Sequence, residues 1–465
     1  MKIILLVPDG VGVRNYLFSS FTSNLIKNNN DVLIYHKLTA SCINEIKAYK
    51  PEIDNFEEIP NFIENIKMRV LRESLAYARL LRNKKILKNN TILNFWSPSK
   101  KGIKKKCLYF CAEVFGKLLS KSNLLLKKGD TLYEKEILFN KNNIFIEQTL
   151  LNFKPDIVLN LHQRSPLTAP IVEISKKLKI KLATVIFSWD NVPKARLISR
   201  YDFYFVWSSL MKKELNLLYP DINEKQIKIT GTPQFEFYQN EKLIVKKETF
   251  FNEYNLDLGK KTVCFSGDDV LTSPNDPVYL EAIAKAITSM PKEKQYQILF
   301  RRCPVDLSGR YDDIVDKYSN IIKLAPPIWN FDKSKKNKFT LVYPKFDDIK
   351  LLVNTVKHCD VVINLGSTMA HDFAVLNKPA IYLNYDVATN NKCSVKTVYN
   401  FQHFRSMKGL QPVFWLNNEK EILNCIYQSL NNSSKVIKDS QKWLNIIANQ
   451  EQVCFNNVLN EILNE

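Results

Sequence analysis

A short segment that could bind phosphate follows one of the apolar runs of the chain. Residues 364–372 read Asn-Leu-Gly-Ser-Thr-Met-Ala-His-Asp and lie between the run DVVINL and a helical pattern. Gly366 would let the backbone approach a ligand. Ser367 or Thr368 would cap the helix, whose N–H groups and dipole favour an anion. We therefore predict a phosphate site that includes His371 and needs no Walker lysine. A plain helix cap is the alternative.

Two arginines follow another apolar run, QILF, in the same half of the chain. Arg301 and Arg302 come directly after it. A guanidinium group at the end of a strand can form bidentate hydrogen bonds with a diphosphate or a carboxylate. We predict that one of the two faces the ligand, and a pair of surface arginines is the alternative.

Adjacent acidic residues follow a third run, TVCF. Gly267 precedes Asp268 and Asp269, whose carboxylates could hold a metal ion but more often cap helices or face water. We assign Gly267 and Asp268 to the phosphate-binding set. No residues in the sequence have the spacing of metal ligands, so we expect neither a metal nor a cofactor.

Two residues in the first half could remove a proton from a hydroxyl group. His162 follows the run DIVLNL, and Asp190 comes shortly after the run LATVIF. Histidine and aspartate are common general bases. For each, the alternative is a loop residue that caps or hydrogen-bonds its own turn, and the sequence does not decide which of the two is the base.

The N-terminal apolar run KIILLV leads into a glycine turn. Gly10 and Gly12 are followed by Arg14 and Asn15, and the third glycine of a dinucleotide fingerprint is absent. The turn therefore does not indicate NAD. We assign these four residues to the acceptor side of the site.

The elements that position these groups alternate as βαβ units. A strand, a glycine turn, a helix and a second strand (DVLIY) open the chain, and the alternation resumes after residue 143. Continuous apolar runs predict parallel strands covered on both faces, and such sheets bind ligands at the carboxyl ends of their strands. We expect an α/β protein with two doubly wound, Rossmann-like domains facing a cleft.

The same rhythm predicts where the domains begin and end. We expect an acceptor domain over 1–232 with a basic helical insertion over about 52–143, a linker over 233–260, a donor domain over 261–415 and C-terminal helices over 416–465. The run FTLVY at 339–343 is predicted to be a strand of the donor domain.

The net charge of +20 is concentrated in the insertion. Residues 79–128 contain fourteen lysines and arginines but a single acid, Glu113, which leaves a net charge of +13. Lys100, Lys101 and Lys104–Lys106 interleave with large apolar residues, a pattern that can lie on an anionic membrane surface. A solvated helical insertion is the alternative. No zinc finger or RNP-type motif supports nucleic acid as a partner.

Composition places the chain among globular proteins. Of its 465 residues, 45% are hydrophobic and 25% are charged, which excludes wholesale disorder. Nine cysteines without repeated short spacings fit a reducing compartment. The start does not look like a secretion signal, and no apolar window reaches the roughly eighteen residues of a spanning helix. We expect a cytoplasmic protein whose contact with the inner membrane, if any, is peripheral.

Several of these segments together resemble the GT-B class of bacterial glycosyltransferases. They are the N-terminal strand with its glycine turn, 187–191 (FSWDN), 226–233 (QIKITGTP), 301–304, and 363–372 followed by Lys378-Pro379-Ala380. The resemblance covers nearly the whole chain except about 52–143. Residues 363–379 are also similar to surface-polysaccharide and glycerol-phosphate polymer transferases.

The resemblance implies metal-independent transfer of a sugar from a nucleotide-sugar donor to a hydroxyl of a surface glycan, which is commonly lipid-linked. The Glu-x6-Glu donor motif of the common retaining branch is absent around 366–378, which favours inversion. His162 or Asp190 would deprotonate the acceptor. Ser367, Thr368 and one of the two arginines would meet the charge on the leaving phosphate. The alternatives are a CDP-polyol phosphotransferase, a nucleotide-sugar epimerase and a non-enzymatic binding module.

Overall fold

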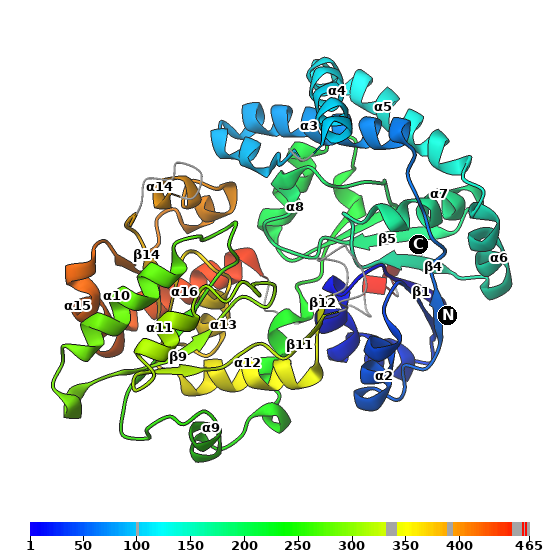
Figure 1. Ribbon diagram of the computed structural model, residues 1–465. Coiled ribbons are helices and arrows are strands. Elements are labelled where there is room, and N and C mark those ends of the chain that lie inside the picture. Colours follow the sequence, from blue (N-terminus) through cyan, green and yellow to red (C-terminus); the bar gives the residue numbers. More distant parts are fainter. Residues whose placement is uncertain (99–101, 332–341, 388–393, 449–457, 460, 463–465) are drawn as a thin grey trace. The chain divides into compact units, whose positions relative to one another are not determined.

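The chain divides into two compact units (Figure 1). A computed structural model describes residues 1–98, 102–331, 342–387, 394–448, 458–459 and 461–462. Unit 1 comprises Met1–Thr232, Phe401–His403 and Ile447–Glu465, and unit 2 comprises Pro233–Asn400 and Phe404–Ile446.

Unit 1 is built on a parallel sheet of seven strands in the order β3-β2-β1-β4-β5-β6-β7. In β1 all residues after the lysine are fully buried, as expected for a strand covered by helices on both faces. The order reverses between β1 and β4, because β1 continues toward β2 on one side and β4 toward β5 on the other. The strands are β1 (Lys2–Val7), β2 (Asp31–His36), β3 (Phe56–Glu58), β4 (Ile157–Asn160), β5 (Lys181–Val185), β6 (Phe203–Val206) and β7 (Ile227–Ile229).

The turn after β1 leads into two helical segments. The π-helical turn η1 (Val13–Phe18) comes first, and α1 (Ser20–Lys27) follows it. Ser19 caps α1, since its Oγ accepts a hydrogen bond from the backbone N–H of Phe21 at 3.1 Å. The other helices that alternate with the strands are α2 (Ala40–Tyr49), α7 (Ala169–Lys177) and α8 (Ser209–Leu218).

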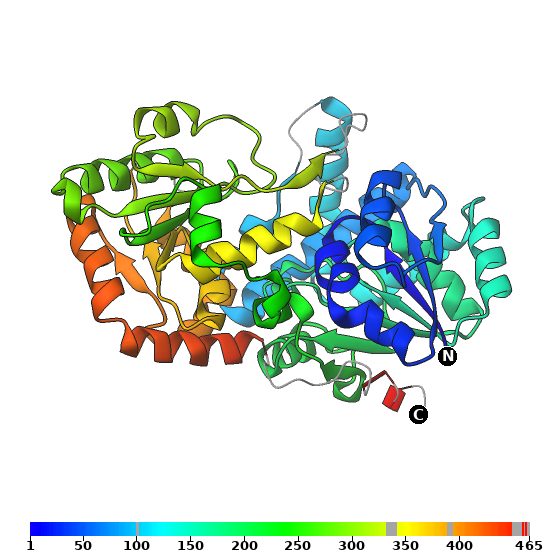
Figure 2. The ribbon, with the colours of Figure 1, turned by 90° about the horizontal axis from the view of Figure 1, so that it is seen from below.

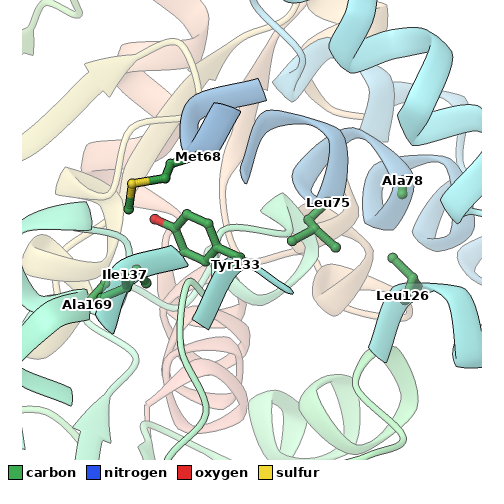
Figure 3. Close-up of a cluster of buried hydrophobic side chains, with 7 residues drawn as sticks. All are labelled: Met68, Leu75, Ala78, Leu126, Tyr133, Ile137 and Ala169. Atoms are coloured by element: carbon green, nitrogen blue, oxygen red, sulfur yellow. The ribbon is translucent and has the colours of Figure 1, made fainter. Parts of the chain in front are cut away.

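A helical insertion between β3 and β4 carries most of the positive charge. It comprises α3 (Ile66–Leu87), η2 (Asn90–Phe95), α4 (Ile103–Leu119), α5 (Asn123–Leu138) and α6 (Asn143–Phe153). Leu75 of α3 and Tyr133 of α5 pack in one buried cluster with Ala169 of α7, which attaches the insertion to the rest of unit 1 (Figure 3). Lys100 and Lys101 lie outside the described residues.

Unit 2 is built on a parallel sheet of six strands in the order β10-β9-β8-β13-β14-β15, with helices on both sides of it (Figure 2). The order reverses between β8 and β13. The strands are β8 (Thr262–Ser266), β9 (Gln297–Arg301), β10 (Ile322–Leu324), β13 (Val361–Asn364), β14 (Ala380–Leu383) and β15 (Phe414–Leu416). Its helices are α9 (Lys247–Glu253), α10 (Asp276–Thr288), α11 (Asp312–Lys317), α12 (Phe346–His358), α13 (Met369–Val375), α14 (Val395–Val398), α15 (Ile422–Asn431) and α16 (Ser434–Ile447).

The two Rossmann-like α/β domains predicted from the sequence are confirmed. The prediction for 339–343 is wrong in its described part, because β12 (Val342–Pro344) pairs antiparallel with β11 (Trp329–Phe331) in a separate two-stranded sheet. Residues 339–341 lie outside the described residues. Three short edge or near-edge strands, β3, β10 and β15, complete the large sheets without having been predicted.

Candidate active site

A histidine and an aspartate meet where the strand order of unit 1 reverses. Leu6 of β1 lies opposite Asn160 of β4 in the sheet register, so the residues just beyond both strands emerge side by side. His162 Nδ1 lies 2.7 Å from Asp9 Oδ2, and Asp9 is 3% exposed. A carboxylate accepts hydrogen bonds, so Nδ1 carries the proton in this pair and Nε2 can accept one. His162 thus has the partner that a general base needs, and the Asp9 carboxylate stabilises the charge that the ring would gain.

The loop that carries His162 is fixed to the loop after β5. The His162 ring makes an edge-to-face contact with Phe187, with ring centroids 4.7 Å apart. Arg164 Nη1 donates a hydrogen bond to Asn191 Oδ1 at 2.8 Å. The two loops predicted to hold a base therefore belong to one contiguous arrangement.

Asp190 is held by a cation. Its Oδ2 accepts a hydrogen bond from Lys194 Nζ at 2.5 Å, and its Oδ1 accepts one from Ser188 Oγ at 2.7 Å. Burial alone would raise the pKa of Asp190. Lys194, His403 and Ser188 outweigh burial and bring the pKa well below its ordinary value. A carboxylate stabilised in this way is a weak base, so of the two predicted candidates the geometry favours His162.

Glu214 of α8 is a buried carboxyl group near Asp190 that the sequence analysis missed. Burial and the charge of Asp190 raise its pKa to about 7, although a hydrogen bond from Gln402 Nε2 at 3.3 Å opposes the shift. His403 follows Gln402 in the chain. Burial lowers its pKa to about 4, and its ring packs edge-to-face on Trp189. Segment 401–403 thus brings groups from a distant part of the chain into unit 1.

The N-terminal glycine turn lies at the same reversal of strand order. Gly12 has φ −78°, so its backbone does not require glycine, and a Cβ there would meet Leu161 only at ordinary contact distance, 3.5 Å. Val13 N donates to Gly10 O at 3.3 Å as η1 begins. Arg14 and Asn15 are half-buried within η1. π-helical turns occur often at functional sites.

In unit 2 the turn after β13 lies at the corresponding reversal. Ile363 of β13 lies opposite Phe265 of β8, so Gly366 and Gly267 both follow the ends of adjacent strands. Gly366 has φ +69°, and an added Cβ would lie 2.8 Å from Phe404 Cζ, so glycine is required there. Ser367 N donates to Asn364 Oδ1 at 2.8 Å.

The hydroxyl groups of this turn differ in what they contact. Ser367 Oγ accepts a long hydrogen bond, 3.5 Å, from Met369 N. Thr368 precedes α13, is exposed, and makes no capping hydrogen bond with its side chain. Of the two predicted caps, Ser367 contacts the start of the helix with its side chain, whereas Thr368 does so with its backbone carbonyl.

The acidic loop after β8 is fastened by Arg310. Its Nη2 donates to Asp268 O at 2.7 Å, while Asp268 N donates to Asp276 Oδ2 at 2.6 Å. Burial, followed by the charges of Asp276 and Asp269, raises the pKa of Asp268 to about 8. At neutral pH this carboxyl group is therefore mostly protonated and can donate a hydrogen bond. Gly267 is closely covered, because an added Cβ would lie 2.6 Å from the hydroxyl of Tyr311.

The two predicted arginines are both engaged by the protein itself. Arg301 is 6% exposed, and its Nη2 donates to both carboxylate oxygens of Asp348 at 2.9 Å. Arg302 Nη1 donates to the carbonyl of Asp306 at 2.6 Å and so holds its own loop. Both guanidinium groups thus fix the polypeptide beyond β9.

His371 of α13 lies in the core of unit 2. It is 1% exposed, and its ring lies 4.2 Å from that of Trp443 on α16. This contact positions α13. Among the described residues, no three His, Cys, Asp or Glu side chains are grouped so that they could hold a metal ion.

Comparisons with known proteins identify the fold. No protein-family model and no curated protein matches the chain. Solved structures with the same fold include a UDP-GlcNAc 2-epimerase from Neisseria meningitidis bound to UDP-GlcNAc (12% identity, 100% of each chain covered, TM-score 0.55). They also include a UDP-GlcNAc 2-epimerase from Methanocaldococcus jannaschii (14% identity, 96% of this chain and 99% of that chain, TM-score 0.51). A third is a glycosyltransferase from Rickettsia africae ESF-5 (13% identity, 100% of this chain and 98% of that chain, TM-score 0.51). The GT-B fold expected from the sequence is thereby confirmed.

The shifted pKa of Glu214 predicts a pH-dependent stability difference. The folded protein keeps a proton on Glu214 up to about pH 7, whereas an unfolded glutamate releases it near pH 4.5. Stability from this group is therefore lost as the pH rises from 4.5 through 7. Glu214→Gln removes the titration, so denaturant melts should show the variant gaining about 3 kcal/mol on wild type between pH 5 and pH 8.

The matched control for this measurement is Glu224→Gln. Glu224 is also in unit 1, but its side chain is 66% exposed. This variant should show the same difference from wild type at both pH values. A Glu214→Gln variant whose difference from wild type does not change with pH would contradict the assignment.

Proposed function

We propose that the protein is a glycosyltransferase that moves a sugar from a nucleotide-sugar donor to a hydroxyl group of a glycan acceptor. The observation that carries the proposal is the chemistry at the two reversals of strand order. In unit 1 this point holds the His162–Asp9 pair, and in unit 2 it holds the turn at Gly366 beside Gly267. Reversal points are where open α/β sheets bind ligands.

The donor class is supported by the solved structures of the same fold. Two of them are named as UDP-GlcNAc 2-epimerases, one of which has UDP-GlcNAc bound, and another is named as a glycosyltransferase. All three names refer to enzymes of sugar chemistry. The names support a nucleotide sugar as the ligand. The type of reaction is proposed from the residues of the candidate active site.

The donor diphosphate is proposed to lie at the turn between β13 and α13. The exposed Thr368 hydroxyl and the backbone of Gly366 and Ser367 would contact its oxygens. Asp268, protonated at neutral pH, would donate a hydrogen bond to a phosphate or sugar oxygen. Arg301, Arg302 and His371 would act as positioning residues, since their contacts are within the protein.

In the proposed reaction His162 Nε2 takes the proton of the acceptor hydroxyl, and the resulting oxygen attacks the anomeric carbon of the donor. The bond between this carbon and the diphosphate oxygen breaks with inversion, and the diphosphate leaves with the electron pair. Asp9 stabilises the protonated His162 ring, and the turn at Gly366 stabilises the leaving group without a metal. Gly10, Gly12, Arg14 and Asn15 are proposed to border the acceptor.

Epimerisation of the nucleotide sugar is the second candidate, favoured by the structures named as 2-epimerases. An epimerase would act on the donor alone, and it would need a base near C2 of the sugar instead of near an acceptor. A CDP-polyol phosphotransferase would differ in its donor.

Asp9→Asn is expected to lower turnover by roughly 10²–10⁴-fold, the contribution typical of general acid–base catalysis, because the amide does not stabilise the imidazolium.

Turnover would be followed by proton NMR in D2O, with UDP-GlcNAc alone and then with a hydroxyl acceptor. Release of UDP only with acceptor supports transfer. Deuterium at C2 without acceptor identifies an epimerase. Asp190→Asn at the other candidate base is the comparison: if it costs more turnover than Asp9→Asn, Asp190 is the base.

Ser367→Ala with Thr368→Ala is expected to weaken nucleotide binding by about tenfold, since the Thr368 hydroxyl contact to phosphate is lost together with the Ser367 hydroxyl that contacts the start of α13. Calorimetry with UDP, CDP, CMP, GDP and dTDP would identify the nucleobase of the donor and give the affinity. Ser394→Ala with Thr397→Ala, another Ser/Thr cap in unit 2, is the matched control. Equal affinities in wild type and the first variant would refute the phosphate site, and a preference for CDP would favour the polyol alternative.

We also propose that the insertion lies on an anionic membrane surface, where a lipid-linked acceptor would be found. Ala112 and Gly116 of α4 are buried, and a Cβ on Gly116 would lie 2.9 Å from Ser74 O of α3. The opposite side of α4 exposes large apolar side chains beside Lys117: Ile103 is 80%, Phe110 67% and Leu118 52% exposed. A helix that is already packed on one face normally has a polar outer face.

The surroundings of this exposed face match a bilayer. Val114 and Phe115 extend it, and Lys104–Lys106, all exposed, stand at the start of the helix. Apolar side chains flanked by lysines are the pattern of helices that lie in the plane of an anionic membrane interface. In the described part of the chain, no helix is long and apolar enough to span a membrane.

Binding to anionic vesicles is expected to be strong at low salt and to weaken as salt rises. Replacing Lys104, Lys105 and Lys106 with glutamine should weaken it mainly at low salt, because charge attraction is screened. Phe110→Ala with Leu118→Ala should weaken it at every salt concentration, because apolar burial is lost. The control replaces Lys285, Lys292 and Lys294, exposed lysines of unit 2, with glutamine. Wild-type protein that ignores anionic vesicles at low salt would refute the proposal, and a dimer lost in the Phe110 variant would indicate self-association.

A further inference from the structure

The helical insertion contains a cavity that no part of the proposed reaction uses. Its volume is about 380 Å³, and it lies within unit 1 between α3, α5 and the residues that follow α8. It does not include His162, Asp190 or any other residue of the candidate active site.

The cavity carries an excess of positive charge. Among the residues that line it, four are cationic, namely Arg79, Arg82, Lys127 and Arg200, and two are acidic, namely Asp130 and Asp221. The two carboxylates are already neutralised. Asp130 accepts hydrogen bonds from Arg79 at 2.5 and 2.6 Å, and Asp221 accepts one from Arg200 Nε at 2.5 Å.

Arg82 and Lys127 are the cations left without a carboxylate. Among the described residues, the guanidinium of Arg82 hydrogen-bonds to neutral oxygens, the carbonyl of Ser120 at 3.3 Å and the side chain of Asn123, and to no carboxylate. Within the described residues, Lys127 Nζ forms no ion pair or hydrogen bond. Two uncompensated positive charges beside a cavity favour a ligand with one or two negative charges.

The wall behind these cations is rigid. The guanidinium groups of Arg79 and Arg200 lie over the ring of Tyr219, with their carbons 5.9 and 5.3 Å from its centroid. Tyr219 is 3% exposed, so the ring cannot move aside without breaking the core. These two guanidinium groups thus form a fixed wall, and a preformed cavity lowers the entropic cost of binding a ligand.

Three leucines give the cavity an apolar part beside its two asparagines, Asn83 and Asn123. Leu124, Leu126 and Leu218 line the cavity, and Leu124 is 62% exposed at the start of α5. The turn after α4 and the first residue of α5 contribute the oxygens that contact Arg82. A suitable ligand therefore combines a phosphate group with an attached apolar or sugar part.

We propose that this cavity binds a phosphate ester, either a phosphomonoester or a diphosphate, through Arg82 and Lys127. The ester could be a soluble sugar phosphate or the headgroup of a phospholipid or lipid-linked acceptor. The site does not depend on the proposed transferase reaction.

The test is calorimetry with pyrophosphate as the probe. Arg82→Gln with Lys127→Gln should weaken binding at this cavity at least tenfold. Lys121→Gln with Lys128→Gln removes the same charge from exposed lysines of the insertion that do not line the cavity, and it should change the affinity less than twofold. Lys127→Gln alone, which removes no ion pair or hydrogen bond among the described residues, should give an intermediate loss. Equal losses in the cavity variant and the control, or no loss in either, would overturn the proposal.

Pyrophosphate could also bind at the nucleotide site of unit 2, so all titrations are repeated with Ser367→Ala and Thr368→Ala present. A cavity effect that persists in this background separates the two sites, and one that vanishes overturns the cavity proposal. Flotation with phosphatidylcholine vesicles containing phosphatidic acid identifies the source of the ester. Competition by pyrophosphate, together with loss of flotation only in the cavity variant, indicates a lipid headgroup. Flotation unchanged by the cavity variant, with pyrophosphate binding reduced, indicates a soluble phosphate ester.

Discussion

The reversal of strand order in each sheet is the constraint on which the chemical groups of this protein depend. Because crossovers between parallel strands are right-handed, the chain that leaves β1 covers one face of its sheet, and the chain that leaves β4 covers the other. The carboxyl ends of these two strands are therefore not closed by a helix, and their loops meet. This explains how Asp9 and His162, 153 residues apart, come within 2.7 Å of each other. The same geometry in unit 2 brings together the loops that contain Gly267 and Gly366.

Charge then differentiates the titratable groups at the edge of unit 1. Asp190 has Lys194 as its partner and stays ionised, whereas the donor that Glu214 has among the described residues is an amide, and Glu214 keeps its proton to about pH 7. Two carboxyl groups in one neighbourhood thus have opposite proton affinities, which is how folds separate acid and base roles. In the reaction proposed above, His162 would be the base, because its carboxylate partner leaves one ring nitrogen open to a substrate proton.

Much of the fold could be predicted from the sequence, since a strand buried on both faces must be apolar throughout, as KIILLV and DVVINL are. The short strands β3, β10 and β15 were missed because strands of three residues at or near a sheet edge need little apolar character. Of the candidate site, His162, Asp190 and the turn at Gly366 were visible because they follow long apolar runs. Asp9, which also follows such a run, could have been found by pairing the two strand ends. The contact between Glu214 and Gln402 could not have been found in this way, since a contact across 188 residues leaves no local pattern in the sequence. The engagement of Arg301 by Asp348 was hidden for the same reason.

Segment 401–403 gives the two units an unusual covalent relationship. The chain passes from one unit to the other four times, at residues 232–233, 400–401, 403–404 and 446–447. The two units are therefore joined by four peptide connections instead of one linker. A fragment that ends at Thr232 would lack the amide that contacts Glu214 and the imidazole beside Trp189. Neither unit is therefore a transferable module as a continuous stretch of sequence. A chimaera that exchanges unit 2 for that of another protein would have to keep residues 401–403 and 447–465 from the original protein, because these segments belong to unit 1.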